Sequence, residues 1–231
     1  MPNWASCSYR LYDSAEHLQE VMTAYDAVKN EQAEANLVYR EKRNALARQG
    51  FSDATIVRTL SQCGICKGDD SVWLIDVLVK MGFPREEMRG EGNIRGYLCD
   101  DPTVSTSRDC LSFECEAAWG TPDGFTDLLR RRFPDLEFLY SCEESGNGLY
   151  VTNDPDIAGT RVVDSEQGDY QRCANDEEFT GFIAELARGN NDNDVIEDAA
   201  QAEAYIRRRN EMADRVGSEN HIWVNVFELS D

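Results

Sequence analysis

Polar and apolar residues alternate near the start of the chain, and this pattern predicts a strand followed by a helix. The alternation covers residues 5–12 and has the period of a half-buried strand. Asp13 then stands three residues before Glu16, in the spacing of a capping box, and apolar residues recur at helical spacing over 18–25. We therefore expect the first helix to follow the first strand directly.

The next segment, residues 27–90, has the pattern of a helical block. Polar helical sequence with sparse apolar positions covers residues 30–49, and a short capped helix is expected over 52–60. Residues 72–81 carry one apolar stripe, which predicts a third helix.

The central part of the chain combines strands with another helix. Residues 94–99 and 111–117 have strand-like composition and are separated by turn sequence, so we expect them to pair. A threonine cap followed by a proline opens a helix over residues 121–133. Further strands are predicted over 136–142, 149–152 and 161–164.

The end of the chain is predicted to contain two helices and a strand. The helices cover residues 176–188 and 195–215, and the start of each has an Asn or Asp three residues before a Glu, the spacing of a capping box. In the second helix this cap is Asp194. Residues 221–229 have the composition of a final strand.

This order of elements predicts an α+β fold in three parts. Without the helical block, the order is strand-helix-strand-strand-helix-strand, which is the split pattern of a ferredoxin-like antiparallel sandwich. We expect that domain in residues 1–26 and 91–165. A helical insertion at 27–90 would interrupt it, and an acidic helical extension with a terminal strand would follow at 166–231.

The charge of the chain changes the functional picture more than any motif. The 231 residues include 44 acidic and 23 basic ones, a formal net charge of -21. Residues 141–231 alone contain twenty-one Asp or Glu against seven Arg and no Lys. Such a field repels nucleic acid and lipid headgroups and attracts basic protein surfaces. We therefore expect a basic protein partner and no direct contact with nucleic acid or membrane.

Three short motifs resemble a known family. They are Met1-Pro2-Asn3-Trp4 before the first strand, Glu116 to Trp119 followed by Pro122, and the segment 143–150. They are similar to phage and plasmid proteins with a YubB-type ferredoxin-like domain. The likeness covers residues 1–25 and 92–165. In the family a Cys commonly stands at the position of Ala5, and a Pro-Gly pair at that of Ser145-Gly146. The resemblance implies the fold and an origin in a mobile element, but no activity.

The setting of the chain is expected to be cytoplasmic. No apolar run approaches the roughly 20 residues that span a bilayer, and the start of the chain does not resemble a secretion signal. The eight cysteines are therefore expected to be mostly free thiols.

Two segments have partial metal-site patterns. Cys63 and Cys66 have the spacing of zinc ligands, but the sequence offers no further ligands with matching spacing, so we expect a turn between helices with reduced thiols. The segment Asn190–Asp194 resembles a calcium loop in composition and lacks its glycine and its bidentate glutamate. We predict no metal and no cofactor.

Candidate catalytic groups are weak. Glu114 and Glu116 would share one face of a strand, and Glu143-Glu144 form another carboxylate pair, but no nucleophile accompanies them. His17, within an amphipathic helix, is expected at the surface or its boundary. The sequence contains no P-loop, GxGxxG or HExxH motif. We expect no enzymatic activity and assign no catalytic residue.

The large aromatic and basic residues receive structural interpretations. Trp4, Trp73, Trp119 and Trp223 are expected to be core aromatics. The arginine runs 130–132 and 207–209 are each expected late in a helix, where cations complement the helix dipole.

The leading hypothesis is a non-enzymatic acidic binding protein. Its acidic face would dock on the basic nucleic-acid channel of a host defence nuclease, of a restriction or CRISPR system, as a decoy for phosphate. The candidate partner-binding residues are Glu177, Glu178, Glu185, Asp192, Asp194, Glu197 and Asp198.

Two alternatives remain open at this stage. The helical insertion could bind a partner through an apolar patch that includes Val38, Phe51, Ile56 or Leu60, with incidental acidity. A small enzyme with an unrecognised site would need a concave pocket with convergent polar groups.

Overall fold

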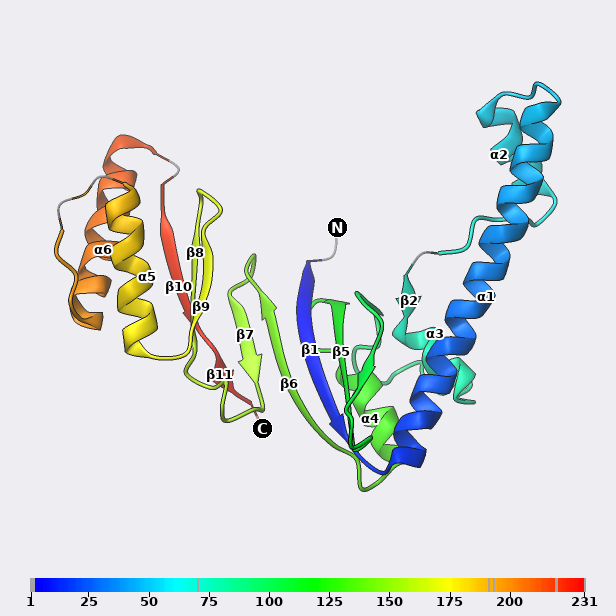
Figure 1. The fold of residues 1–231 in the computed structure, drawn as a ribbon, viewed down its shortest axis with the longest axis horizontal. Coiled ribbons are helices and arrows are strands. Elements are labelled where there is room, and N and C mark those ends of the chain that lie inside the picture. The colour runs from blue at the N-terminus through cyan, green and yellow to red at the C-terminus, as the bar shows by residue number, and fades with distance from the viewer. Residues whose placement is uncertain (1–2, 70, 191, 193, 219, 231) are drawn as a thin grey trace. The chain divides into compact units, whose positions relative to one another are not determined.

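The structure, a computed structural model, describes residues 3–69, 71–190, 192, 194–218 and 220–230 (Figure 1). The described residues form an α+β chain with six helices. The chain divides into two compact units, Met1–Phe138 and Leu139–Asp231, each of which contains helices and strands.

The first unit is built on an antiparallel sheet. β1 (Trp4–Tyr12) pairs with β5 (Cys110–Ala118) along its whole length, and the pairs run from Trp4 opposite Ala118 to Tyr12 opposite Cys110. β3 (Gly96–Leu98) pairs with the other edge of β5, and β2 (Val72–Trp73) pairs with β3. The two-residue β4 (Thr103–Val104) also pairs with β5.

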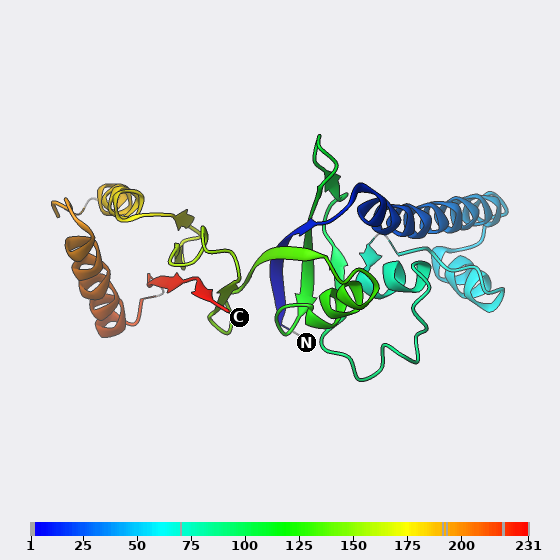
Figure 2. The same ribbon diagram turned by 90° about the horizontal axis from the view of Figure 1, so that it is seen from below.

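Helices cover one face of this sheet (Figures 1 and 2). They are α1 (Ala15–Arg48), α3 (Leu74–Lys80) and α4 (Asp123–Arg132). Alternate residues of β1 and β5 point into the core that these helices close, because side chains alternate between the two faces of a strand. The ring of Phe113 on β5 illustrates this packing, since it stacks on Tyr9 at 5.2 Å between centroids and meets Phe125 of α4 at 6.0 Å.

The start of the chain departs from the sequence prediction in two ways. Ser14, not Asp13, caps α1 and accepts the backbone N–H of His17, while Asp13 binds the His17 ring at 2.9 Å. The helical sequence over residues 30–49 also continues the first helix without a break, so the domain boundary predicted between residues 26 and 27 lies inside α1. Residues 15–48 contain neither Gly nor Pro, so nothing in the sequence breaks the helix at the predicted boundary.

Two further helix starts were predicted too early. Residues 72–81 were expected as one helix, but Val72 and Trp73 form β2 and the helix starts at Leu74. Pairing with β3 fixes these two residues in extended form. α4 starts at Asp123 with Pro122 at the cap position, so Thr121 lies outside the helix.

The outer half of α1 and α2 (Asp53–Gln62) form a helical arm, defined as residues 32–62 (Figure 1). Almost all of α1 beyond Val28 is at least partly exposed. Ile56 and Leu60 of α2 are buried, so their predicted place in an exposed patch was wrong. Val38 and Phe51 are exposed as predicted, together with Leu37 and Val57.

The second unit contains two groups of strands. β6 (Glu137–Glu144), which begins in the first unit, pairs antiparallel with β7 (Leu149–Thr152), and β11 (Glu228–Leu229) lies parallel to β7. β8 (Arg161–Ser165) is the middle strand between β9 (Tyr170–Cys173) and β10 (Ile222–Val226). The strand expected over 221–229 is thus two strands, separated at the buried Phe227.

The helices α5 (Asp176–Gly189) and α6 (Ala199–Val216) pack on the sheet of β8, β9 and β10 (Figure 1). Phe179 and Ile183 of α5 meet Ala202 and Tyr205 of α6 in a core that also contains Val163 of β8. The second predicted helix starts later than expected, because Asp198 rather than Asp194 is its cap.

The four tryptophans were expected to be core aromatics, but none of them is fully buried. Trp119 is 64 % exposed and Trp223 is 46 % exposed, while Trp4 and Trp73 are half-buried. Trp119 also has a backbone φ of 70°, in the left-handed region, directly after the last residue of β5.

The cysteines follow the expectation for the most part. Free thiols are found at Cys63, Cys66, Cys99, Cys110, Cys115 and Cys173, while Cys7 and Cys142 are disulfide-bonded. Burial raises the pKa of the Cys115 thiol, which therefore stays protonated. None of the described helices combines the length and the apolarity that a membrane crossing requires.

Candidate functional site

The predicted acidic residues lie on α5 and in the segment that connects it to α6 and includes the cap of α6. The two helices run side by side in the same direction, so both helix N-termini lie at one end of the pair (Figure 1). Glu177 and Glu178 are in the first turn of α5, and Glu197 and Asp198 stand at the start of α6. We call this the acidic helix end, defined as residues 176–178, 197 and 198.

Two members of the acidic helix end cap the helices. Asn175 accepts the backbone N–H of Glu178 at 2.9 Å, as predicted for the cap of α5, while the Glu178 carboxylate accepts the N–H of Ala174 at 2.9 Å, one residue before the cap. Asp198 accepts the N–H of Gln201 at 2.8 Å. These carboxylates complement the positive ends of the helix dipoles, so part of the acidity has a structural role.

The other members of the acidic helix end face water. Glu177 and Glu197 are exposed, and neither carboxylate has a hydrogen-bond or ion-pair partner among the described residues. Asp176 binds Arg161 at 2.5 Å but its side chain stays 71 % exposed. The carboxylates therefore remain accessible to a cation from outside.

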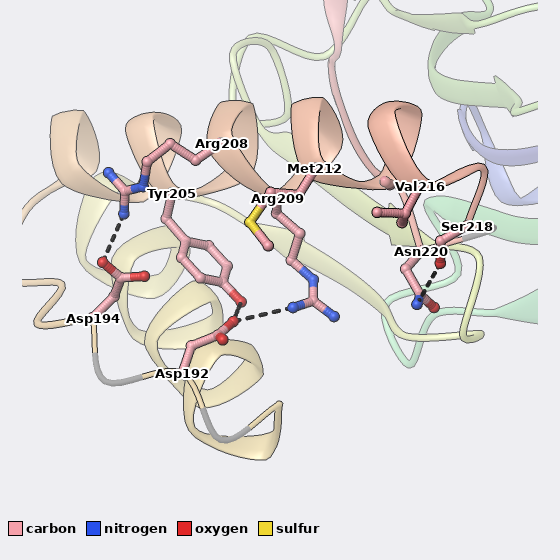
Figure 3. A pocket seen from close by; sticks show the side chains of 10 residues that line it. Asp192, Asp194, Tyr205, Arg208, Arg209, Met212, Val216, Ser218 and Asn220 are labelled. Carbon is pink, nitrogen blue, oxygen red and sulfur yellow. Dashed lines mark hydrogen bonds and ion pairs between the residues drawn. The ribbon is translucent and has the colours of Figure 1, made fainter.

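Asp192 and Asp194 are not at this end; they line a pocket of about 230 Å³ beside α6 (Figure 3). Asp194 binds Arg208 at 2.7 Å. Asp192 accepts the hydroxyl of Tyr205 at 2.8 Å and binds Arg209 at 3.1 Å. The loop is thus fastened to α6 by two ion pairs and a phenol.

The positive and negative side chains that line this pocket balance each other. Each of its two guanidinium groups already has a carboxylate, and exposed Met212 and Val216 form an apolar rim (Figure 3). Burial and then the hydrogen bond to Asp192 raise the pKa of Tyr205 to about 12, so this phenol is neutral and is neither a base nor a nucleophile near pH 7.

The seven predicted residues are therefore not on one face. Four are at the acidic helix end and two are in the pocket, while Glu185 lies near the other end of α5, 3.9 Å from Arg188. Sequence reasoning missed the partners Tyr205, Arg208 and Arg209. Their three- and four-residue spacing places them on one side of α6 and was the available signal.

Among the described residues, the structure brings no further metal ligands to the two partial metal-site patterns. Cys63 ends α2 and Cys66 follows it, and both are exposed free thiols. Within the described ranges no group of three or more His, Cys, Asp or Glu side chains could hold a metal ion. Two positions of the calcium-like segment, Asn191 and Asn193, lie outside the described residues, as does Asp70 of the turn after Cys63.

The carboxylate pairs and His17 have separate environments. Glu114 and Glu116 share one face of β5 as predicted, whereas Glu143 and Glu144 point to opposite sides of β6. Glu143 accepts the Tyr170 hydroxyl, and Glu144 is buried and accepts a backbone N–H. His17 stacks on Phe133 at 4.5 Å.

The arginine runs differ from each other. Arg130, Arg131 and Arg132 occupy the last turn of α4 as predicted. The run 207–209 was expected late in a helix but lies in the middle of α6, where Arg208 and Arg209 bind the loop.

Comparison of the chain with models of protein families, with curated proteins and with solved structures found no match.

Proposed function

We propose that this chain is a non-enzymatic acidic binding protein that occupies a basic nucleic-acid-binding surface as a phosphate decoy. The single observation that carries the proposal is the acidic helix end, where Asp176 and Glu177 of α5 and Glu197, directly before the cap of α6, are exposed. They lie in residues 141–231, which contain seven Arg and no Lys against twenty-one acids.

The proposed partner is a host defence nuclease of a restriction or CRISPR system. Such enzymes bind DNA largely through Lys and Arg contacts to phosphates, and these contacts release counterions. Carboxylates held on helices can meet the same cations without ordering a flexible segment, which lowers the entropic cost of association. The complex should therefore weaken steeply as salt concentration rises.

The proposal is tested with charge-neutral variants. The triple variant Asp176→Asn, Glu177→Gln, Glu197→Gln removes three charges from the acidic helix end. The matched control Glu34→Gln, Glu41→Gln, Glu86→Gln removes three exposed charges from the first unit. Inhibition of DNA cleavage and binding by native mass spectrometry or calorimetry are measured against a panel of basic nucleases at graded salt.

The expected result is a salt-sensitive inhibitor whose affinity falls about tenfold or more in the helix-end variant and about twofold in the control. Equal losses in both variants would mean that net charge alone acts, and this would refute the site. The absence of salt-sensitive association with every nuclease would refute the function.

A second candidate function has its own observation. The helical arm exposes Leu37, Val38, Phe51 and Val57, at 54 %, 45 %, 47 % and 54 % of their surface. Several exposed apolar side chains on one arm favour a protein partner. Phe51→Ser combined with Val57→Ser would abolish binding through the arm, while the helix-end variant would leave it intact.

We also propose that the first unit has the ferredoxin-like fold of the YubB-type mobile-element proteins. Three features support it: β1 and β5 pair antiparallel, β3 flanks β5, and Phe138 at the start of β6 lies 6.3 Å from Tyr9 of β1, ring to ring. A crystal structure would test it, since the fold requires β6 beside β1 and β3 at the opposite side of β5.

A further inference from the structure

The face of the first sheet that turns away from the helices carries an aromatic cluster. The strands present Trp4, Ser6 and Ser8 from β1 and Glu114 and Glu116 from β5 on this face, because these positions alternate with the buried ones. Tyr97 lies opposite Glu116, and Trp73 lies opposite Tyr97. Trp4, Tyr97 and Trp73 are thus brought together from three strands.

The three rings are inclined to one another. The centroid of Tyr97 is 5.4 Å from that of Trp4 and 5.4 Å from that of Trp73, at interplanar angles of 62° and 65°. Trp4 and Trp73 are 6.3 Å apart at 57°. All three residues are only half-buried. A cation over the π-face of one ring therefore lies close to a second ring.

Carboxylates hold two of the rings. Glu116 accepts the Tyr97 hydroxyl at 3.2 Å, and Asp69 accepts the Trp73 indole N–H at 2.6 Å. A hydrogen bond from a ring to a carboxylate increases the electron density of that ring, which strengthens its attraction for a cation. Both carboxylates also remain close to the cluster as negative charges.

The residues around the cluster already show a preference for positive charge. The guanidinium of Arg95 lies over the Trp4 ring, 5.9 Å from its centroid. Burial and the charges of Glu116 and Glu114 raise the pKa of the Cys99 thiol at the same face, as expected where the potential is negative. Phosphate would be repelled here, so the face is unsuited to nucleic acid despite its aromatic rings.

We propose that the cluster of Trp4, Trp73 and Tyr97, with Glu116 and Asp69, binds an alkylated ammonium group. An unmodified ammonium ion keeps its strong hydration, whereas methyl groups remove much of that hydration and pack against aromatic rings. Methylated lysine side chains and free quaternary amines share this chemistry. The site lies in the first unit and does not depend on the acidic helix end.

The test is calorimetric titration of the full chain with tetramethylammonium chloride and, at equal ionic strength, with ammonium chloride. Parallel titrations with choline and with an N-trimethyl-lysine peptide distinguish a free amine from a protein-borne one. The variants are Trp73→Leu, which removes a ring, and Glu116→Gln, which keeps the shape and removes the charge. Trp223→Leu, in the second unit, is the matched control, and circular dichroism checks that each variant folds.

The expected result is that tetramethylammonium binds at least about fivefold more tightly than ammonium. Trp73→Leu should abolish this preference, Glu116→Gln should weaken binding about threefold or more, and Trp223→Leu should leave it unchanged. Equal binding of the two ions, or a preference that survives Trp73→Leu, overturns the proposal. Binding of a single-stranded oligonucleotide that Trp73→Leu abolishes would also overturn it and assign the face to nucleic acid.

Discussion

His221 is held between carboxylates from two different elements of the second unit. Its Nε2 lies 3.0 Å from Asp214 of α6, and its Nδ1 lies 3.3 Å from Glu166 in the turn after β8. The ring also stacks on Trp223 at 6.1 Å. Only the doubly protonated imidazolium can donate to both carboxylates, so these contacts raise the pKa of His221.

This geometry predicts a pH dependence of stability. The raised pKa means that the folded chain binds the proton more tightly than the unfolded chain. The stabilisation is complete below pH 6.5, the ordinary value of the imidazole, and is lost as the pH rises through the folded-state pKa. Urea unfolding between about pH 6 and pH 9 should show the midpoint falling in the wild type and a flatter profile in His221→Gln. An NMR titration midpoint at or below 6.5 would contradict this.

Two glycines in helices are predicted to respond oppositely to the same substitution. A Cβ on Gly124 of α4 would stand 2.6 Å from the carbonyl oxygen of Gly92, whereas a Cβ on Gly181 of α5 would meet nothing within 4 Å. Gly124→Ala should lower the free energy of unfolding by about 1–3 kcal/mol. Gly181→Ala should raise it by about 0.5–1 kcal/mol, since alanine favours helix more than glycine. Denaturant unfolding measures both, and a stabilised Gly124→Ala would show that the close approach is relaxed.

At the scale of elements, the helical arm depends on few buried side chains. Ile56 and Leu60 are the buried residues of α2, and a helix without tertiary packing is marginal in water. The arm should therefore open locally without unfolding the sheet of β1 and β5.

Ile56→Ala is predicted to release the outer arm. Truncation of a buried isoleucine to alanine costs about 2–5 kcal/mol of stability. We expect this loss to exceed the packing free energy that holds the short helix α2 in place. Hydrogen exchange should rise over residues 40–62 and stay slow in β1. Val57→Ala, at an exposed neighbouring position, is the control and should leave hydrogen exchange unchanged both over residues 40–62 and in β1. An unchanged exchange rate in Ile56→Ala would show that α2 does not hold the arm.

The sequence predicted elements well where the signal was local. The cap of α5 at Asn175 and the alternation in β1 each depend on residues close in sequence, and both are confirmed. Trp73 was misassigned because its apolar neighbours fit a helical stripe, and only pairing with Tyr97 makes it a strand residue. The aromatic cluster could not be predicted for the same reason, since three strands distant in sequence assemble it.

The candidate site was also predicted in part. Contacts between residues close in sequence were predicted, and contacts between distant residues were not. Capping by Glu178 follows from spacing alone. Asp194 has the same spacing to Glu197 but binds Arg208, fourteen residues away, so a tertiary ion pair replaced the expected cap. Local patterns of acids therefore identify candidate helix starts but not which carboxylates stay free.

At the scale of the molecule, the surplus of negative charge dominates the electrostatics. Even if every one of the 23 basic residues were paired, nearly half of the 44 acids would have no opposite charge. Repulsion among the surplus acids opposes folding.

Salt is therefore predicted to stabilise the protein. Between about 0.05 and 0.5 M NaCl, screening should weaken the repulsion more than it weakens the exposed ion pairs, which contribute little. The urea midpoint should rise. The helix-end triple variant, which has three fewer surplus charges, should show a smaller response to salt. A midpoint that falls with salt would show that the ion pairs outweigh the repulsion.

The loop beside α6 has a consequence for how the purified protein behaves. Asp192 and Asp194 already neutralise Arg209 and Arg208, so a polyanion would have to displace carboxylates of the same molecule before it could reach these guanidinium groups. An internal competitor of this kind is always present at high local concentration. The protein should pass through a heparin column unretained and leave the cell lysate without attached RNA.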